Sequence, residues 1–128
     1  ADIERAAALG ARFVKLKLMK LGSLDRLAHG LDRIRALGMT PVLGNGVASE
    51  VGCWMEAAIA RTHIDNAGEL NGFLRQAAPI CASPLTASRG AVELSPGWRP
   101  LLDGERIAAA RVDARRVTAS RRILEPLT

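Results

Sequence analysis

The spacing of apolar and polar residues changes period several times along this chain. Over residues 13–18, apolar side chains at the even positions alternate with Lys15 and Lys17. This period of two predicts a strand whose lysines share one face and whose apolar residues share the other. Over residues 24–37, apolar residues recur at intervals of three and four, which predicts an amphipathic helix capped by Ser23.

Similar patterns predict the remaining elements. These are a helix over 1–9, a strand over 40–43, a helix from Ala48 or Ser49 with Val51, Met55, Ala58 and Ile59 on its inner face, a short strand near Ile64 or Leu70, a strand over 91–94, and a segment near 111–119. Strands recur about every 27 residues in alternation with helices. This order is typical of parallel strands with helical crossovers, in a barrel or a doubly wound sheet.

The charge of the chain is concentrated near its end. The 128 residues are 48% apolar with a formal charge of +5, much of it from arginines beyond residue 104. Acidic residues interrupt this basic tail and no aromatic residue follows Gly104, so a solvated face is favoured and nucleic acid is not an expected partner. No run of eighteen apolar residues occurs, so no membrane span is expected. The start lacks a signal-peptide pattern and an initiator Met, which indicates an internal start.

The cysteines and the glycine loop exclude several cofactor classes. Cys53 and Cys81 do not have metal-ligand spacing with either histidine. Two buried thiols in a reducing cytoplasm are expected, with a disulfide between them as the alternative. Gly44-Asn45-Gly46 matches a dinucleotide-binding motif only in part, so no nucleotide cofactor is expected.

Two lysines on one strand are the strongest chemical signal. If helices cover the apolar face, Lys15 and Lys17 face the interior of a barrel, where an unpaired charge is costly. A lysine held there can act as a base, and Lys17 lies nearer the carboxyl end of the strand, where barrel enzymes place their chemistry. The residues alone leave open a second interpretation, in which both lysines reach solvent from an edge strand.

Several blocks together resemble the enolase superfamily. VKLKLMKLGS (14–23) resembles the sixth barrel strand of that superfamily, whose usual motif is close to N-[IL]-K-L-x-K-x-G-G. In this chain Ser23 replaces the second glycine, and Lys15 stands where asparagine is common. TPVLGNGVASEVG (40–52) resembles the seventh strand and its loop, and ELNGFL (69–74) the eighth, where epimerases often read D-L-D-G-P-L. VELSPGWRPLLDGERI (92–107) resembles the closing segment. Over about residues 1–111 the chain is similar to the mandelate racemase/muconate lactonizing enzyme family, on its muconate-lactonizing and dipeptide-epimerase side.

The Lys-x-Lys pair could instead correspond to a different barrel strand of that family. The subgroup also has such a pair on its second strand, but the next strand would then end in a metal-binding aspartate. Here the strand over 40–43 is followed by Gly44-Asn45-Gly46, with no carboxylate. The sixth strand is therefore the better match.

The resemblance implies an α/β fold, the C-terminal portion (about strands six to eight) of a (β/α)8 TIM-type barrel. Residues 1–90 would belong to the barrel, and residues 91–128 would form a closing segment that returns to a capping domain. Family members bind Mg²⁺ through carboxylates that end strands three, four and five. Those strands would lie outside this chain, so no metal ligand is expected among its residues.

The resemblance also implies the site residues. Lys17 matches the acid/base of the sixth strand. The expected substrate-binding residues are Lys15, Asn45, Gly46, Glu69 and Asn71. Glu69 and Asn71 match positions where dipeptide epimerases hold the ammonium group of the substrate. Asn71 is an amide where aspartate is typical, and Ala48 stands near a position that is often glutamate, which puts dipeptide specificity in doubt.

The leading hypothesis is part of a Mg²⁺-dependent enzyme that abstracts the proton α to a carboxylate, as a racemase, epimerase, cycloisomerase or dehydratase. Its expected partners are a small carboxylate substrate, the rest of the barrel, the capping domain and further copies in a cytoplasmic homo-oligomer. The 128 residues alone are expected to be inactive. The alternatives are a non-catalytic truncated barrel remnant with an assembly or binding role, and a basic nucleic-acid module.

Overall fold

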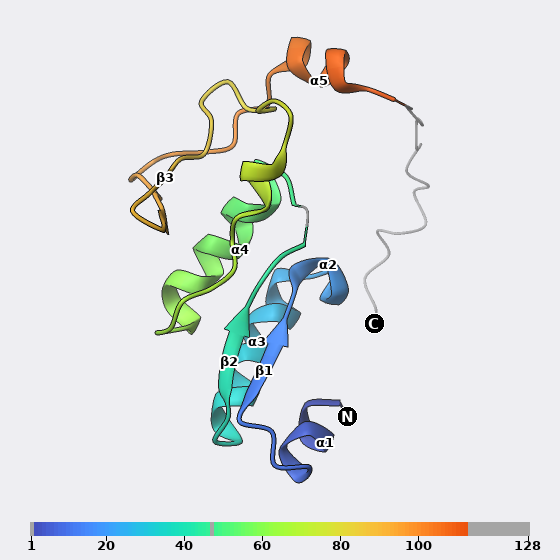
Figure 1. Cartoon of the computed structure of the whole chain (residues 1–128), viewed down its shortest axis with the longest axis vertical. Helices are drawn as coiled ribbons and strands as arrows, with labels where there is room; N and C mark the ends of the chain where they lie inside the picture. Colours follow the sequence, from blue (N-terminus) through green and yellow to red (C-terminus); the bar gives the residue numbers. More distant parts are fainter. Residues whose placement is uncertain (1, 47, 113–128) are drawn as a thin grey trace, which may run out of the picture.

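Helices and strands alternate in the first half of the molecule (Figure 1). The computed structural model describes residues 2–46 and 48–112. Its elements are α1 (Asp2–Ala8), β1 (Phe13–Leu16), α2 (Leu18–Leu21), α3 (Leu24–Ala36), β2 (Thr40–Leu43), α4 (Glu50–His63), the 3₁₀ helix η1 (Gly72–Arg75), β3 (Ala87–Ser88), β4 (Ala91–Val92) and α5 (Gly104–Ala110). Most of the segment expected near 111–119 lies outside the described residues.

The strands pair in parallel, as the sequence predicts. β1 pairs with β2 in a register that places Phe13 opposite Thr40 and Leu16 opposite Leu43. Gly44 forms a further parallel bridge with Glu69. The third strand, expected near Ile64 or Leu70, is thus a single bridge, and the three segments lie side by side in chain order.

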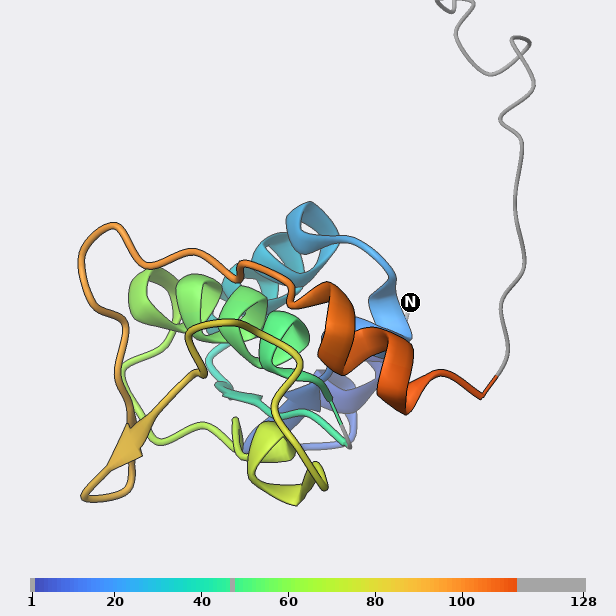
Figure 2. The ribbon, with the colours of Figure 1, turned by 90° about the horizontal axis from the view of Figure 1, so that it is seen from above.

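One face of β1 and β2 is covered by helices. Leu27 and Leu31 of α3 form a fully buried core with Leu43, and Leu16 and Leu18 pack against it. Figure 2 shows α3 and α4 on the same side of the two strands. The prediction that Leu16 and Leu18 face a helix layer is confirmed, because the stripe on α3 supplies that layer.

The strand predicted over 13–18 is too long. It ends at Leu16, and Lys17 precedes the short helix α2. The amide of Leu18 donates to the Oε1 atom of Glu56 over 3.0 Å instead of to a neighbouring strand. A side chain of α4 thus takes the place of a ladder partner and lets the chain turn.

The predicted inner face of α4 is partly wrong. Ala58 is exposed, and the buried residues of this helix are Glu50, Cys53, Glu56 and Ala57. The apolar pattern missed the two glutamates because it assigns charged residues to the solvent side. A buried carboxylate is tolerated where backbone N–H groups donate to it, and both glutamates accept such bonds.

Glu50 connects α4 to the second half of the chain. Its side chain is 1% exposed, and it accepts hydrogen bonds from the backbone amides of Ile80 (2.7 Å), Cys81 (3.0 Å) and Leu85 (2.9 Å). A second core lies beside this connection. It contains Cys53, Phe73 and Leu85, with Trp54 and Trp98 packed against it.

The hairpin of β3 and β4 replaces the strand expected over 91–94. Only Ala91–Val92 is extended, and it pairs antiparallel with Ala87–Ser88. The expected boundary between residues 90 and 91 falls within this hairpin. Cys53 and Cys81 are free, buried thiols, so the disulfide alternative is wrong. Within residues 2–46 and 48–112, no helix is long and apolar enough to cross a membrane.

The exposed apolar residues predict that the isolated chain aggregates or unfolds without a sharp transition. Phe13 on β1 is 62% exposed, Met19 65% and Leu74 63%. Such surfaces promote association, and a two-stranded sheet is a marginal structure by itself. We expect the isolated 128 residues to aggregate or to unfold over a broad temperature range, as measured by circular dichroism with light scattering. A sharp cooperative transition of a monomer would contradict this expectation.

Candidate functional site

Backbone hydrogen bonds bring the residues of the candidate site together at the carboxyl end of the sheet. The amide of Gly44 donates to the Leu16 carbonyl (3.0 Å), and the amide of Glu69 donates to the Leu43 carbonyl (2.9 Å). The Asn45 amide then donates to the Glu69 carbonyl over 2.9 Å. Because carboxyl ends of parallel strands meet at one edge, residues that follow each segment become neighbours.

A cavity of about 260 Å³ opens at this edge. It is lined by Lys17, Asn45, Gly46, Glu69, Asn71 and Arg75. Five of these residues are expected from the sequence, and they come from three separate segments. Arg75 was missed, although its position in the turn directly after the eighth-strand block could have indicated it.

Lys17 lies where β1 gives way to α2. Its backbone is extended (φ −138°, ψ 133°), and the residue is half-buried. It lines the cavity instead of extending into bulk solvent, and the strand before it is in a parallel sheet. The residue lies at the carboxyl end of a parallel strand, which is the edge where α/β-barrel enzymes place their catalytic side chains.

Lys15 reaches the same edge but does not line the cavity. Its amine forms an ion pair with the Oε2 atom of Glu69. This bond and the charge of Lys15 lower the pKa of Glu69, with a smaller contribution from the charges of Lys17 and Arg75. Glu69 is therefore an ionised carboxylate with a cation already bound to it, which makes it a weaker partner for an ammonium group.

Asn45 and Glu56 form a buried polar layer behind Lys17. Asn45 is 5% exposed, and its Nδ2 atom donates to the Cys53 sulfur at 3.2 Å. Glu56 is 2% exposed, and burial raises its pKa, against the opposing effects of the Leu18 amide, Asn45 and the Lys17 charge. Sequence reasoning missed Glu56 because nothing in the helical pattern separates it from a surface residue.

Gly72 lets η1 approach the loop after β2. A Cβ atom at this position would lie 2.5 Å from the Ala48 nitrogen and 2.9 Å from the Gly46 oxygen. Both are backbone atoms, so neither can rotate away. The absence of a side chain at residue 72 therefore helps to fix Gly46 at the cavity.

The residues of the site do not fit a magnesium ion. No group of three His, Cys, Asp or Glu side chains that could hold a metal occurs in the described part of the chain. The two carboxylates on which the Lys17 charge acts have other partners, since Glu69 binds Lys15 and Glu56 binds the Leu18 amide. Mg²⁺ requires several oxygen ligands in octahedral geometry.

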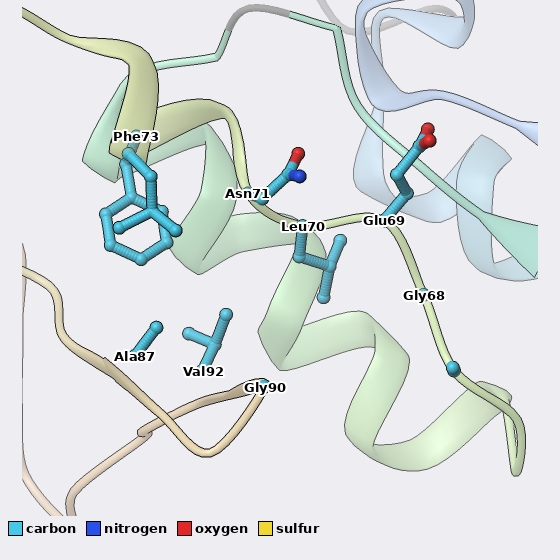
Figure 3. A pocket seen from close by; sticks show the side chains of 10 residues that line it. Gly68, Glu69, Leu70, Asn71, Phe73, Ala87, Gly90 and Val92 are labelled. Carbon is cyan, nitrogen blue, oxygen red and sulfur yellow. The ribbon is translucent and has the colours of Figure 1, made fainter.

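A second, mainly apolar cavity lies on the other side of the segment that contains Glu69. It measures about 440 Å³, and residues of the β3–β4 hairpin line one of its walls. Figure 3 shows Leu70, Phe73 and Val92 around it, whereas the Glu69 side chain points away. Alternation along the extended segment thus sends Glu69 and Leu70 to different sides.

Comparison with known proteins supports this fold. No family model matches the chain, and no curated protein matches it. A solved structure of a mandelate racemase/muconate lactonizing protein from Herpetosiphon aurantiacus is similar, with a TM-score of 0.63 and 24% sequence identity. The alignment covers 73% of this chain and 27% of that one.

The chain has the fold of part of a mandelate racemase/muconate lactonizing protein. The likeness confirms the resemblance seen in the sequence at the level of fold. The chain spans about a quarter of the length of that solved structure.

The close approach of Gly72 to the loop predicts that alanine destabilises the protein at residue 72 but not at residue 104. Gly72→Ala forces a Cβ against the backbone atoms of Gly46 and Ala48 and should lower the free energy of unfolding by about 1 to 3 kcal/mol. Gly104→Ala is the matched control, because no atom lies within 4 Å of its added Cβ. Thermal midpoints of the full-length gene product that contains the chain measure both effects. Equal midpoints for the two variants would show that the contact does not constrain the loop.

The Lys15–Glu69 ion pair predicts a defined pH response. Since the pKa of Glu69 is lowered in the folded chain, the pair stabilises the fold above the ordinary glutamate pKa and is lost as pH falls through the lowered value. Lys15→Met should return the pKa of Glu69 toward its ordinary value, as measured by carboxyl ¹³C NMR. Lys20→Met, on the exposed side of α2, should leave it unchanged. An unchanged Glu69 titration in Lys15→Met would refute the pairing.

Proposed function

We propose that this chain forms the C-terminal barrel portion, about strands six to eight, of an enolase-superfamily enzyme in the mandelate racemase/muconate lactonizing enzyme family. The enzyme would abstract the proton α to a carboxylate. The observation that carries this proposal is the position of Lys17, at the carboxyl end of a parallel strand and in a cavity with polar walls. The fold likeness and the three sequence blocks support it.

Four residues of the cavity have a direct role in this proposal. The neutral amine of Lys17 accepts the α proton and returns it as an ammonium group, which is general acid–base catalysis. Asn45 and Asn71 can each donate or accept hydrogen bonds to orient the substrate. The guanidinium group of Arg75 can pair with a carboxylate through two parallel N–H bonds.

The charges at the cavity favour an anionic substrate. Glu69 is neutralised by Lys15, which leaves Arg75 as a cation that lines the space, joined by Lys17 once its amine has taken the proton. Fixed positive groups stabilise the negative charge that develops on a substrate carboxylate when the α proton leaves. The same charges oppose a substrate ammonium group, which again argues against a dipeptide substrate.

The remaining parts of the enzyme would come from outside the described residues. The Mg²⁺ ion implied by the resemblance would need its carboxylate ligands there, together with the rest of the barrel and the capping domain. A homo-oligomer in the cytoplasm, acting on a small carboxylate and not on nucleic acid, remains part of the proposal. The isolated 128 residues would be inactive for the same reason.

A non-catalytic remnant with an assembly role is the second candidate. It is favoured by the exposed apolar side chains of Phe13, Leu74 and Leu101, which could pack against another surface. The coding sequence upstream of residue 1 separates the two candidates. Three carboxylates that end successive strands favour the enzyme, and their absence favours the remnant.

The acid/base role predicts the effect of removing the Lys17 amine. In the full-length gene product, Lys17→Ala should reduce exchange of the α proton about 100-fold to 10,000-fold, the usual contribution of a general base. Exchange is measured by NMR in D₂O over a panel of small carboxylates. Lys20→Ala, three residues along, should retain exchange. Retained exchange in Lys17→Ala would overturn the assignment.

A further inference from the structure

A third cavity lies beside the candidate site, and the chemistry described above does not use it. It measures about 250 Å³, and its walls come from α2, the loop after β2 and the first two turns of α4. Most of the wall is apolar, with Leu18, Met19 and Ala48 in it. Asn45 lines this cavity and also the cavity that contains Lys17, so the two spaces adjoin at this residue.

Two buried oxygen atoms at this cavity lack a hydrogen-bond partner. Among the described residues, neither the Oδ1 atom of Asn45 nor the Oε2 atom of Glu56 makes a hydrogen bond. Both residues line the cavity, and they are only 5% and 2% exposed. A buried polar atom without a partner is costly, and native structures retain few of them. The two oxygens therefore indicate a ligand group that bonds to them.

The two side chains lie against the same side of α4. The Nδ2 atom of Asn45 donates to the Cys53 sulfur at 3.2 Å. Cys53 precedes Glu56 by three residues, and side chains at this spacing are neighbours on one face of a helix. Asn45 and Glu56 thus form one polar end of an otherwise mainly apolar space.

The hydrogen-bonding roles of the two oxygens differ, which narrows the class of ligand group. The Oδ1 atom of Asn45 can only accept. Burial is the largest effect on the Glu56 carboxyl group and raises its pKa, which favours the neutral acid. Its Oε1 atom accepts the Leu18 amide, so the proton of the neutral acid belongs on Oε2, which is then a donor. A hydroxyl group complements both atoms, because its oxygen accepts while its proton is donated.

We propose that this cavity is a subsite for a largely apolar substituent of the substrate that carries a hydroxyl group. Glu56 donates to the hydroxyl oxygen, and the hydroxyl group donates to the Oδ1 atom of Asn45. The assignment to the substrate rests on the proposed function, in which the adjoining cavity holds the carboxylate and the α carbon beside Lys17. The preference for a hydroxyl group rests only on this cavity and its two oxygens.

The test uses phenol and toluene as probes, which are nearly equal in size and differ by a hydroxyl against a methyl group. The full-length gene product is labelled with ¹³C at its methionine methyl groups. Met19→Leu identifies the signal of Met19, which lines the cavity, and the buried Met39, which does not line it, is the internal reference. Phenol should move the Met19 signal and should bind about tenfold more tightly than toluene, because toluene leaves both buried groups unpaired.

Three substitutions connect this preference to the two oxygens. Asn45→Leu and Glu56→Met each remove one oxygen partner at nearly constant size, and each should abolish the preference for phenol. Glu56→Met also removes the acceptor of the Leu18 amide, so Asn45→Leu decides the question if circular dichroism shows that Glu56→Met is unfolded. Glu50→Gln is the matched control and should keep the preference, because Glu50 is an equally buried glutamate of α4 that does not line the cavity.

Three results would overturn the inference. They are equal affinities for phenol and toluene in the unaltered protein, a Met19 signal that phenol does not move, and a preference that survives in Asn45→Leu. Lys17→Ala separates the subsite from the proposed function, since it should lose α-proton exchange and still prefer phenol. Exchange in the unaltered protein without a preference for phenol would leave the proposed function standing without this subsite.

Discussion

The parallel ladder at the carboxyl ends of three segments is the constraint on which the candidate site depends. It consists of short backbone bonds from Gly44 to Leu16 and from Glu69 to Leu43, followed by one from Asn45 to Glu69. None of these bonds uses a side chain. Residues that are 28 and 52 positions beyond Lys17, namely Asn45 and Glu69, are therefore neighbours of Lys17 whatever their chemistry. The ladder places the side chains, and their chemistry then decides what the cavity can bind.

Local sequence patterns predicted the parts of the fold that depend on local physics. Ser23 and Ser49 cap their helices by accepting the amides of Arg26 and Gly52, as short polar side chains at those positions should. The stripe on α3 gave the correct core, because every fully buried position of that stripe is aliphatic. The parallel pairing followed from the alternation of elements. The cavity residues came from the family resemblance, and the structure brings five of them together.

The features that the sequence did not predict share one cause. Polar contacts between segments far apart in the chain override the local pattern of apolar and polar residues. Glu50 and Glu56 are buried because amides from distant segments donate to them, and the helical period of α4 contains no sign of this. The early end of β1 has the same origin, since Leu18 bonds to Glu56. Arg75 reaches the cavity only because Gly72 allows η1 to pack against the loop at Gly46. Predicting these features from sequence requires knowing which segments meet in space.

The polar contacts also supply the physical basis for the anionic substrate that we propose. Both carboxylates near Lys17 are committed to other groups, Glu69 to the amine of Lys15 and Glu56 to the amide of Leu18. Neither is available to bind a cationic substrate, whereas the amine of Lys17 and the guanidinium of Arg75 still line the space. A sequence with equal numbers of acids and bases at this edge could have bound either charge. The proposed preference for an anion therefore follows from which charged residues are paired, and not from the count of charged residues.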